Sequence, residues 1–102
     1  MDKIVFITGA SSGIGAGCAR KFASQGASLI LNARNVNKLS ALKEELEKQY
    51  GAKIYLLPFD VRDRKAATSA LESLPKEWQS IDILVNNAGL VIGTDKEQDR
   101  KS

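Results

Sequence analysis

The chain contains no histidine, which removes the side chain that most often serves as a general base or a metal ligand. Its one cysteine, Cys18, cannot form a disulfide within the chain, so a reducing cytoplasm is the expected location. No apolar run is long enough to cross a bilayer, and the start, Met1-Asp2-Lys3, does not resemble a secretory signal peptide. We therefore expect a cytoplasmic protein with no metal site and no contact with a membrane.

The chain also lacks a large excess of charge of either sign. The 15 basic residues exceed the 12 acidic residues by only three, and the two kinds are mixed throughout, so no nucleic-acid-binding patch is indicated. Hydrophobic residues make up 43% of the 102 residues, which is ordinary for a globular protein of one domain. In this context Cys18 is expected to be a small core residue rather than a redox centre.

What the sequence does contain is a glycine-rich stretch directly after an apolar run. Residues 4–7 (Ile-Val-Phe-Ile) predict a buried strand, and Gly9, Gly13 and Gly15 follow with the spacing Gly-x-x-x-Gly-x-Gly. Gly9 is expected to permit a tight turn, Gly13 to let a pyrophosphate approach the backbone, and Gly15 to let the next helix pack closely. A strand, such a loop and a helix N-terminus together predict a dinucleotide-binding site.

Periodic patterns place further elements along the chain. Four strands are expected, at residues 3–8, 27–33, 53–59 and 81–86. Three helices are expected between them, at residues 13–25, from Asn35 or Asn37 to Gly51, and from about Asp63 to Pro75. This alternation predicts an α/β protein with a doubly wound parallel sheet in the order 3-2-1-4 and helices on both faces. Residues 1–93 would form this Rossmann-type half-domain, and residues 94–102 a polar tail.

Apolar residues at helical spacing predict which sides of the helices are buried. In the first helix, Ile14, Cys18 and Phe22 recur every four residues and are expected to face the sheet, and the small residues Ala19 and Ala23 are expected to keep that packing tight. The second helix has a stripe of Leu39, Leu42 and Leu46, which should pack against the same sheet.

Two unusual turns are expected to meet at one edge of this sheet. The glycine-rich loop follows strand one, and residues 86–89 (Asn-Asn-Ala-Gly) follow strand four. In the order 3-2-1-4 these strands are neighbours, and winding reverses between them, which is where doubly wound sheets bind ligands. The convergence of two turns about seventy residues apart therefore predicts a site at this crevice.

The motifs resemble those of the short-chain dehydrogenase/reductase family, up to about Gly93. The matching stretches are residues 8–15 (Thr-Gly-Ala-Ser-Ser-Gly-Ile-Gly), 60–61 (Asp-Val) and 86–89. The resemblance implies NAD(P)(H)-dependent interconversion of alcohols and carbonyls, and a homo-oligomer when the sheet is complete. Residues 32–34 and 90–95 are similar to NADP-dependent 3-hydroxy acid and serine-type dehydrogenases within the family.

The resemblance also implies roles for individual residues. Asp60 would meet the adenine edge, Val61 would add a backbone contact, and Asn86 would support the central sheet. Ala88 and Gly89 would line the ribose and nicotinamide side of the cofactor. Without the resemblance, Asp60 and Asn87 are equally well explained as polar turn residues. The residues predicted to bind the cofactor are Gly9, Ser11, Ser12, Gly13, Ile14, Gly15, Arg34, Asp60, Val61, Asn87, Ala88 and Gly89.

The end of the second strand indicates which nicotinamide cofactor is preferred. NAD-binding sites place an acid there for the ribose 2′-hydroxyl, but this chain has Ala33 followed by Arg34. A carboxylate would repel the 2′-phosphate of NADP, whereas a guanidinium binds it through charge-assisted hydrogen bonds. The sequence therefore favours NADP(H) over NAD(H), and the alternative, that Arg34 is only a solvated loop arginine, fits this position less well.

The catalytic Tyr-x-x-x-Lys motif of the family does not occur in these 102 residues. Tyr50 is followed at that spacing by Ile54, and Tyr55 by Phe59. We therefore expect the chain to be the cofactor-binding part of an NADP-dependent oxidoreductase, inactive alone and with no catalytic residue of its own. The alternative is a stand-alone nucleotide-binding or assembly module, and a more distant one is a methyltransferase-type Rossmann domain.

Overall fold

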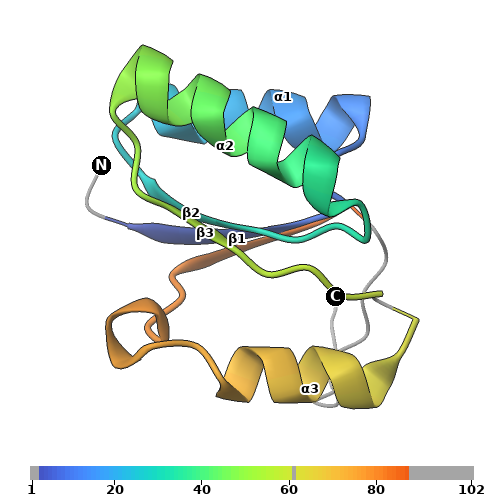
Figure 1. The fold of residues 1–102 in the computed structure, drawn as a ribbon. Helices are drawn as coiled ribbons and strands as arrows, with labels where there is room; N and C mark the ends of the chain where they lie inside the picture. Colours follow the sequence, from blue (N-terminus) through green and yellow to red (C-terminus); the bar gives the residue numbers. More distant parts are fainter. Residues whose placement is uncertain (1–2, 61, 88–102) are drawn as a thin grey trace, which may run out of the picture.

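A four-stranded parallel sheet forms the centre of the computed structural model, which describes residues 3–60 and 62–87 (Figure 1). The strands pair in the order β3-β2-β1-β4 and are β1 (Ile4–Thr8), β2 (Ser28–Leu31), β3 (Ile54–Leu56) and β4 (Ile83–Asn86). The predicted α/β fold and its strand order are confirmed, although β2 to β4 are shorter than the patterns indicated. The predicted tail at residues 94–102 and the boundary at residue 93 lie outside the described residues.

Helices cover both faces of the sheet, as Figure 1 shows. One face carries α1 (Gly13–Ser24) and α2 (Val36–Tyr50), and the opposite face carries α3 (Arg64–Glu72) and the short 3₁₀ helix η1 (Lys76–Trp78). No helix among the described residues is long and apolar enough to cross a membrane. The two layers of helices bury the sheet on both sides, which is why its strands appear as continuous apolar runs.

Local capping explains where the three α-helices begin. Ser12, Asn35 and Asp63 precede α1, α2 and α3, and each side chain accepts a hydrogen bond from the backbone N–H three residues further along. These oxygens satisfy N–H groups that have no partner within the helix. Of the two asparagines predicted to cap α2, Asn35 is therefore the cap. Gly51 ends α2 in the left-handed conformation, with φ 65°.

Alternate residues of the central strands build two cores. Val5 and Ile7 of β1, with Leu29 and Leu31 of β2, point toward α1 and α2 and are completely buried. Phe6 and Ile30 point the other way, into a second core beneath α3 and η1 that also includes Leu57, Leu74 and Trp78. The predicted stripe Leu39, Leu42 and Leu46 is buried in the first of these cores, which confirms the orientation of α2.

The predicted orientation of α1 is partly wrong. Ile14 is 75% exposed, and the buried residues of the helix are Gly15, Ala19 and Ala23. Cys18 and Phe22 are half-buried and flank this row of small residues. Small side chains let α1 lie close to the sheet, and Ile14 belongs to the first turn of the helix, beside the loop. The pattern of large apolar residues at every fourth position therefore identified a row of α1 that lies beside the buried row, not the buried row itself.

Candidate functional site

The glycine-rich loop turns tightly between β1 and α1. Gly9 has φ 61°, in the left-handed region that favours glycine, and its carbonyl accepts hydrogen bonds from the Ser12 N–H (3.1 Å) and the Ser12 hydroxyl (2.9 Å). The same hydroxyl oxygen accepts the Gly15 N–H at 3.0 Å. Ser12 is thus engaged within the loop, where it holds the turn and caps the helix.

The loop leaves backbone donors available at the N-terminus of α1. The N–H groups of Gly13 and Ile14 have no acceptor among the described residues, and a Cβ added at Gly13 would meet no atom within 4 Å. Unpaired N–H groups and the helix dipole favour an anion at this position. The open space at Gly13 is the space that the sequence assigned to a pyrophosphate.

Gly15 shows the opposite situation, because it is tightly enclosed. A Cβ at this position would lie 2.1 Å from the Gly9 carbonyl oxygen and 2.9 Å from the Ala10 Cα, both of which are backbone atoms. The close packing of helix against strand that was predicted for Gly15 is therefore confirmed. Gly13 and Gly15 therefore have different roles. Gly13 leaves open space beside the loop, and Gly15 lets the backbone of the loop pack against α1.

A pocket of about 320 Å³ opens next to the loop, where β1, β2 and β3 end. It brings together residues from three distant parts of the sequence, and the charged side chains among its lining residues are Arg34, Asp60 and Arg62. Such a position at the carboxyl ends of parallel strands is where doubly wound sheets bind ligands. The lining residues are Gly9, Ser11, Asn32, Ala33, Arg34, Phe59, Asp60 and Arg62.

Asn32 was not singled out from the sequence, but it connects the segments that line this pocket through hydrogen bonds. Its side chain is completely buried, and its amide nitrogen donates hydrogen bonds to the carbonyls of Leu57 (3.0 Å) and Phe59 (3.1 Å). Its own backbone carbonyl accepts the Ala10 N–H at 2.8 Å. Asn32 therefore links the glycine-rich loop, the end of β2 and the segment that leads to Asp60. Hydropathy could not reveal this residue, since its partners lie 25 or more positions along the chain.

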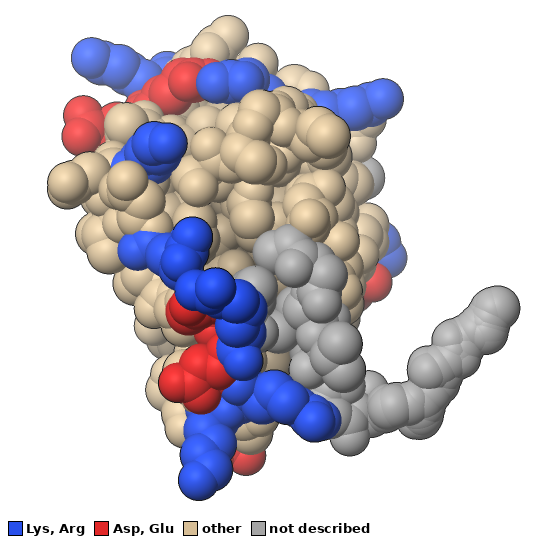
Figure 2. Space-filling model, turned by 90° about the vertical axis from the view of Figure 1, so that its right-hand side faces the viewer, with Lys and Arg blue, Asp and Glu red and all other residues tan. Residues whose placement is uncertain are grey.

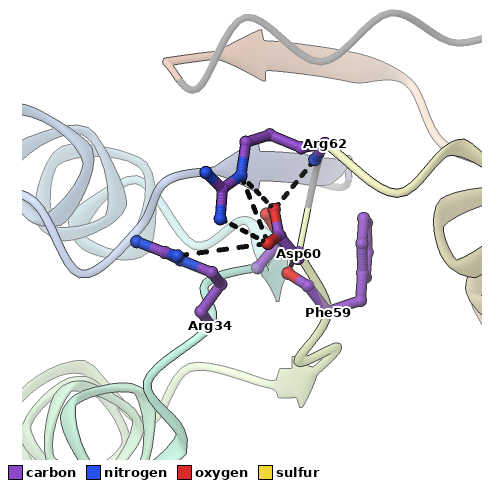
Figure 3. Close-up of polar contacts among 5 residues, drawn as sticks. Arg34, Phe59, Asp60 and Arg62 are labelled. Carbon is purple, nitrogen blue, oxygen red and sulfur yellow. Dashed lines mark hydrogen bonds and ion pairs between the residues drawn. The ribbon is translucent and has the colours of Figure 1, made fainter.

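Two arginines surround the Asp60 carboxylate at the mouth of the pocket (Figure 3). Arg62 lies over the carboxylate and contacts both of its oxygens, with 2.9 Å between Nη2 and Oδ2 and 3.1 Å between Nε and Oδ1. Arg34 approaches from the end of β2 and places Nη1 at 4.0 Å from Oδ2. Three residues with charges of both signs therefore meet at one point on the pocket rim.

The hydrogen bonds from Arg62 lower the pKa of the Asp60 carboxyl. The Arg62 side chain and its backbone N–H lower the pKa of the Asp60 carboxyl from 3.8 to about 2, and the charge of Arg34 adds to this effect. Asp60 is therefore ionised across the whole physiological range. An ionised carboxylate can only accept hydrogen bonds, which suits an amino group as its ligand partner.

An acid titration tests this contact. Because the pKa of Asp60 is depressed in the folded state, its stabilising contribution is complete above the ordinary value of 3.8 and is lost as the pH falls toward about 2. At pH 3.8, NMR of the side-chain carboxyl carbon should show Asp60 almost fully ionised in the folded protein. In Arg62→Gln the same carboxyl should be more protonated at that pH, because the side-chain hydrogen bonds are lost and only the backbone N–H of residue 62 and the charge of Arg34 still lower its pKa. Identical titrations in both proteins would contradict the contact.

A second, shallower hollow lies beside the first and is lined by Ser11, Arg34, Asn35 and Lys38. Arg34 borders both hollows, and Lys38 extends from the first turn of α2. Figure 2 looks onto this edge of the molecule, where lysine and arginine side chains project with a few carboxylates among them. Lys38 was not singled out from the sequence.

The ends of β1 and β4 are joined by side chains as well as by backbone pairing. The hydroxyl of Thr8, which is completely buried, donates to the Asn86 Oδ1 at 3.0 Å, and Thr8 and Asn86 are paired in register. The ends of β1 and β4, from which the two predicted turns begin, are therefore neighbours. Asn87 follows directly and is exposed. Val61, Ala88 and Gly89, which were predicted to bind the cofactor, lie outside the described residues.

The described residues bring Gly9, Ser11, Arg34 and Asp60, four of the residues predicted to bind the cofactor, together around one pocket. Ser12 lies on the adjoining loop, Gly13 and Ile14 begin α1, and Asn87 follows the end of strand β4. Among the described residues there is no group of three or more histidine, cysteine or acidic side chains that could hold a metal ion. The arrangement can hold an anion at the loop and a second anion beside Arg34, with a polar edge at Asp60.

Comparison with known proteins identifies the class to which this fold and pocket belong. A family model described as short chain dehydrogenase matches residues 3–102. The chain is 46% identical over 95 residues to the NADP-dependent 3-hydroxy acid dehydrogenase of Schizosaccharomyces pombe, covering 92% of this chain and 37% of that protein. The chain belongs to the short chain dehydrogenase family.

Solved structures agree with this assignment. L-sorbose reductase from Gluconobacter frateurii, solved with NADPH and L-sorbose, superimposes with a TM-score of 0.80 and 38% identity over 86% of this chain and 34% of that one. Serine dehydrogenase from Escherichia coli superimposes with a TM-score of 0.76 and 46% identity over 87% of this chain and 39% of that one. The predicted resemblance to 3-hydroxy acid and serine-type dehydrogenases is confirmed, and the chain spans little more than a third of these relatives.

Proposed function

We propose that this chain forms the cofactor-binding part of an NADP(H)-dependent oxidoreductase that interconverts an alcohol and a carbonyl by hydride transfer. The observation that carries the proposal is the position of Arg34 beside the same pocket as the glycine-rich loop. In this arrangement the free N–H groups of Gly13 and Ile14 would hold the pyrophosphate. Arg34 would then bind the 2′-phosphate at the other end of the adenosine, with Ser11 and Lys38 bordering the same hollow.

The chemistry of the pocket supports NADP(H) rather than NAD(H). Ala33 is almost completely buried in the pocket wall, at the position where an NAD site would carry an acid. Asp60, the one carboxylate among the described residues that line this pocket, is held by Arg62, and the family resemblance assigns it to the adenine edge. The relatives named as NADP-dependent, and the reductase solved with NADPH, support the same choice of cofactor.

Equilibrium titration tests the proposal directly. The intact protein that carries this sequence is titrated with NADPH and with NADH, and binding is followed by cofactor fluorescence. NADPH should bind at least about tenfold more tightly, because only it offers Arg34 a phosphate. A protein that binds neither cofactor would instead support the stand-alone assembly module, and equal affinity would contradict the role of Arg34.

The 102-residue chain alone should show no oxidation of NADPH with any carbonyl substrate. Hydride transfer requires a proton donor at the carbonyl oxygen, and the family's Tyr-x-x-x-Lys motif does not occur in this sequence. We propose that the proton donor, the substrate pocket and the surfaces of a homo-oligomer belong to further sequence. Absorbance at 340 nm with a panel of aldehydes, ketones and oxo acids provides the measurement. Turnover by the chain alone would show that another residue donates the proton.

A further inference from the structure

Two guanidinium groups compete for one oxygen atom at the pocket mouth. Arg62 Nη2 lies 2.9 Å from Asp60 Oδ2, and Arg34 Nη1 lies 4.0 Å from the same atom (Figure 3). All three side chains line the pocket, and both arginine side chains are largely exposed, at 74% and 69% of their surface. A small movement would therefore allow Arg34 to form a full ion pair with Asp60.

Arg62 already satisfies the carboxylate. Its side chain makes three hydrogen bonds to the two oxygens, of 2.9, 3.1 and 3.3 Å, and its backbone N–H adds one of 2.9 Å to Oδ1. Arg34 is within ion-pair distance of Oδ2 but makes no hydrogen bond to it. Asp60 is thus bound by Arg62 in the bidentate geometry that guanidinium groups prefer, and Arg34 keeps its own donors for another acceptor.

We propose that Arg62 is a positioning residue for cofactor choice, which occupies the Asp60 carboxylate and so leaves Arg34 free to bind the 2′-phosphate. This inference rests on the proposed function and extends it to a residue that the family motifs do not include. Arg62 acts through Asp60 and Arg34 and need not contact the phosphate. The 2′-hydroxyl of NAD carries no charge, so binding of NAD(H) should be indifferent to Arg62.

Two physical effects of losing Arg62 would act in the same direction. The freed carboxylate would attract Arg34, whose guanidinium is already 4.0 Å away, and draw it from the phosphate. The carboxylate would also carry an uncompensated negative charge toward a phosphate with a charge of about −1.5 to −2. Both effects weaken binding of NADP(H) selectively, and both disappear when Asp60 is made neutral.

A four-protein comparison tests the proposal in the intact protein that carries this sequence. Dissociation constants for NADPH and NADH are measured for the wild type, Arg62→Gln, Asp60→Asn/Arg62→Gln and the control Arg64→Gln. Arg64 begins α3 on the surface, carries the same charge and lies outside the pocket beside Arg34. Arg62→Gln should weaken NADPH binding about three- to tenfold and leave NADH binding within about twofold, with no such change in the control.

The double variant separates positioning from direct contact. Asparagine at position 60 weakens any adenine contact equally for both cofactors, so the ratio of NADPH to NADH affinity should return to the wild-type value. A ratio that falls in Arg62→Gln and is not restored would mean that Arg62 binds the phosphate itself, which overturns the positioning role. An unchanged ratio in Arg62→Gln, with NADPH still preferred, overturns the inference but leaves the proposed function standing. Failure of the wild type to bind NADPH would overturn the proposed function.

Discussion

Gly15→Ala should lower the free energy of unfolding by about 3 kcal/mol, a large fraction of the stability of a domain of this size. The added methyl group would lie 2.1 Å from the Gly9 carbonyl oxygen and 2.9 Å from the Ala10 Cα. Neither atom can rotate away as a flexible side chain would, so β1 and α1 must separate or the turn must open. Urea denaturation followed by circular dichroism measures the change.

Two other glycines of α1 provide matched controls for this substitution. Gly17→Ala meets no atom within 4 Å and replaces an exposed helical glycine, so it should stabilise the protein by about 0.5–1 kcal/mol. A Cβ at Gly13 also meets no atom within 4 Å, yet the valine of Gly13→Val would fill the space assigned to the pyrophosphate and should abolish cofactor binding in a protein that remains folded. Retained binding in folded Gly13→Val would show that the loop is only a turn.

Arg34→Ala should weaken binding of NADP(H) by about 1.5–3 kcal/mol, or roughly tenfold to a hundredfold. Its guanidinium borders both hollows at the pocket and makes no hydrogen bond to Asp60, so it is available to the 2′-phosphate. Binding of NAD(H), which has no such phosphate, should hardly change. Calorimetry on the intact protein carrying this sequence measures both affinities, with Arg64→Ala as the control. Equal losses for the two cofactors would contradict a phosphate-binding role.

The architecture was predictable because local and long-range signals agree in the strands and loops. Residues 29–31 (Leu-Ile-Leu) are apolar without alternation, as a strand buried on both faces requires, and all three are completely buried. The glycines also had distinct expected roles, of which the close packing at Gly15 is now explained atom by atom. The ends of strands one and four could be placed side by side because the order 3-2-1-4 makes these parallel strands neighbours, and β1 and β4 do pair.

The features that could not be predicted depend on contacts between residues far apart or on small side chains. Asn32 looks like one polar residue in an apolar strand, and only the folded chain places it beside the Leu57 and Phe59 carbonyls. Arg62 looks like any charged turn residue until its geometry around Asp60 is known. Ile14 was assigned to the core because large apolar residues were counted, whereas the buried residues of α1 are the small residues Gly15, Ala19 and Ala23, whose close packing was predicted.

The strand order has a consequence for how the chain folds during synthesis. β1 can pair with β2 as soon as residues 28–31 have emerged, but its other edge pairs with β4 at residues 83–86, more than seventy positions later. Until then this buried strand exposes one row of backbone N–H and C=O groups. Unpaired strand edges of this kind promote association between incomplete chains. Ribosome-bound chains that end before residue 83 should therefore be the form that most needs a chaperone.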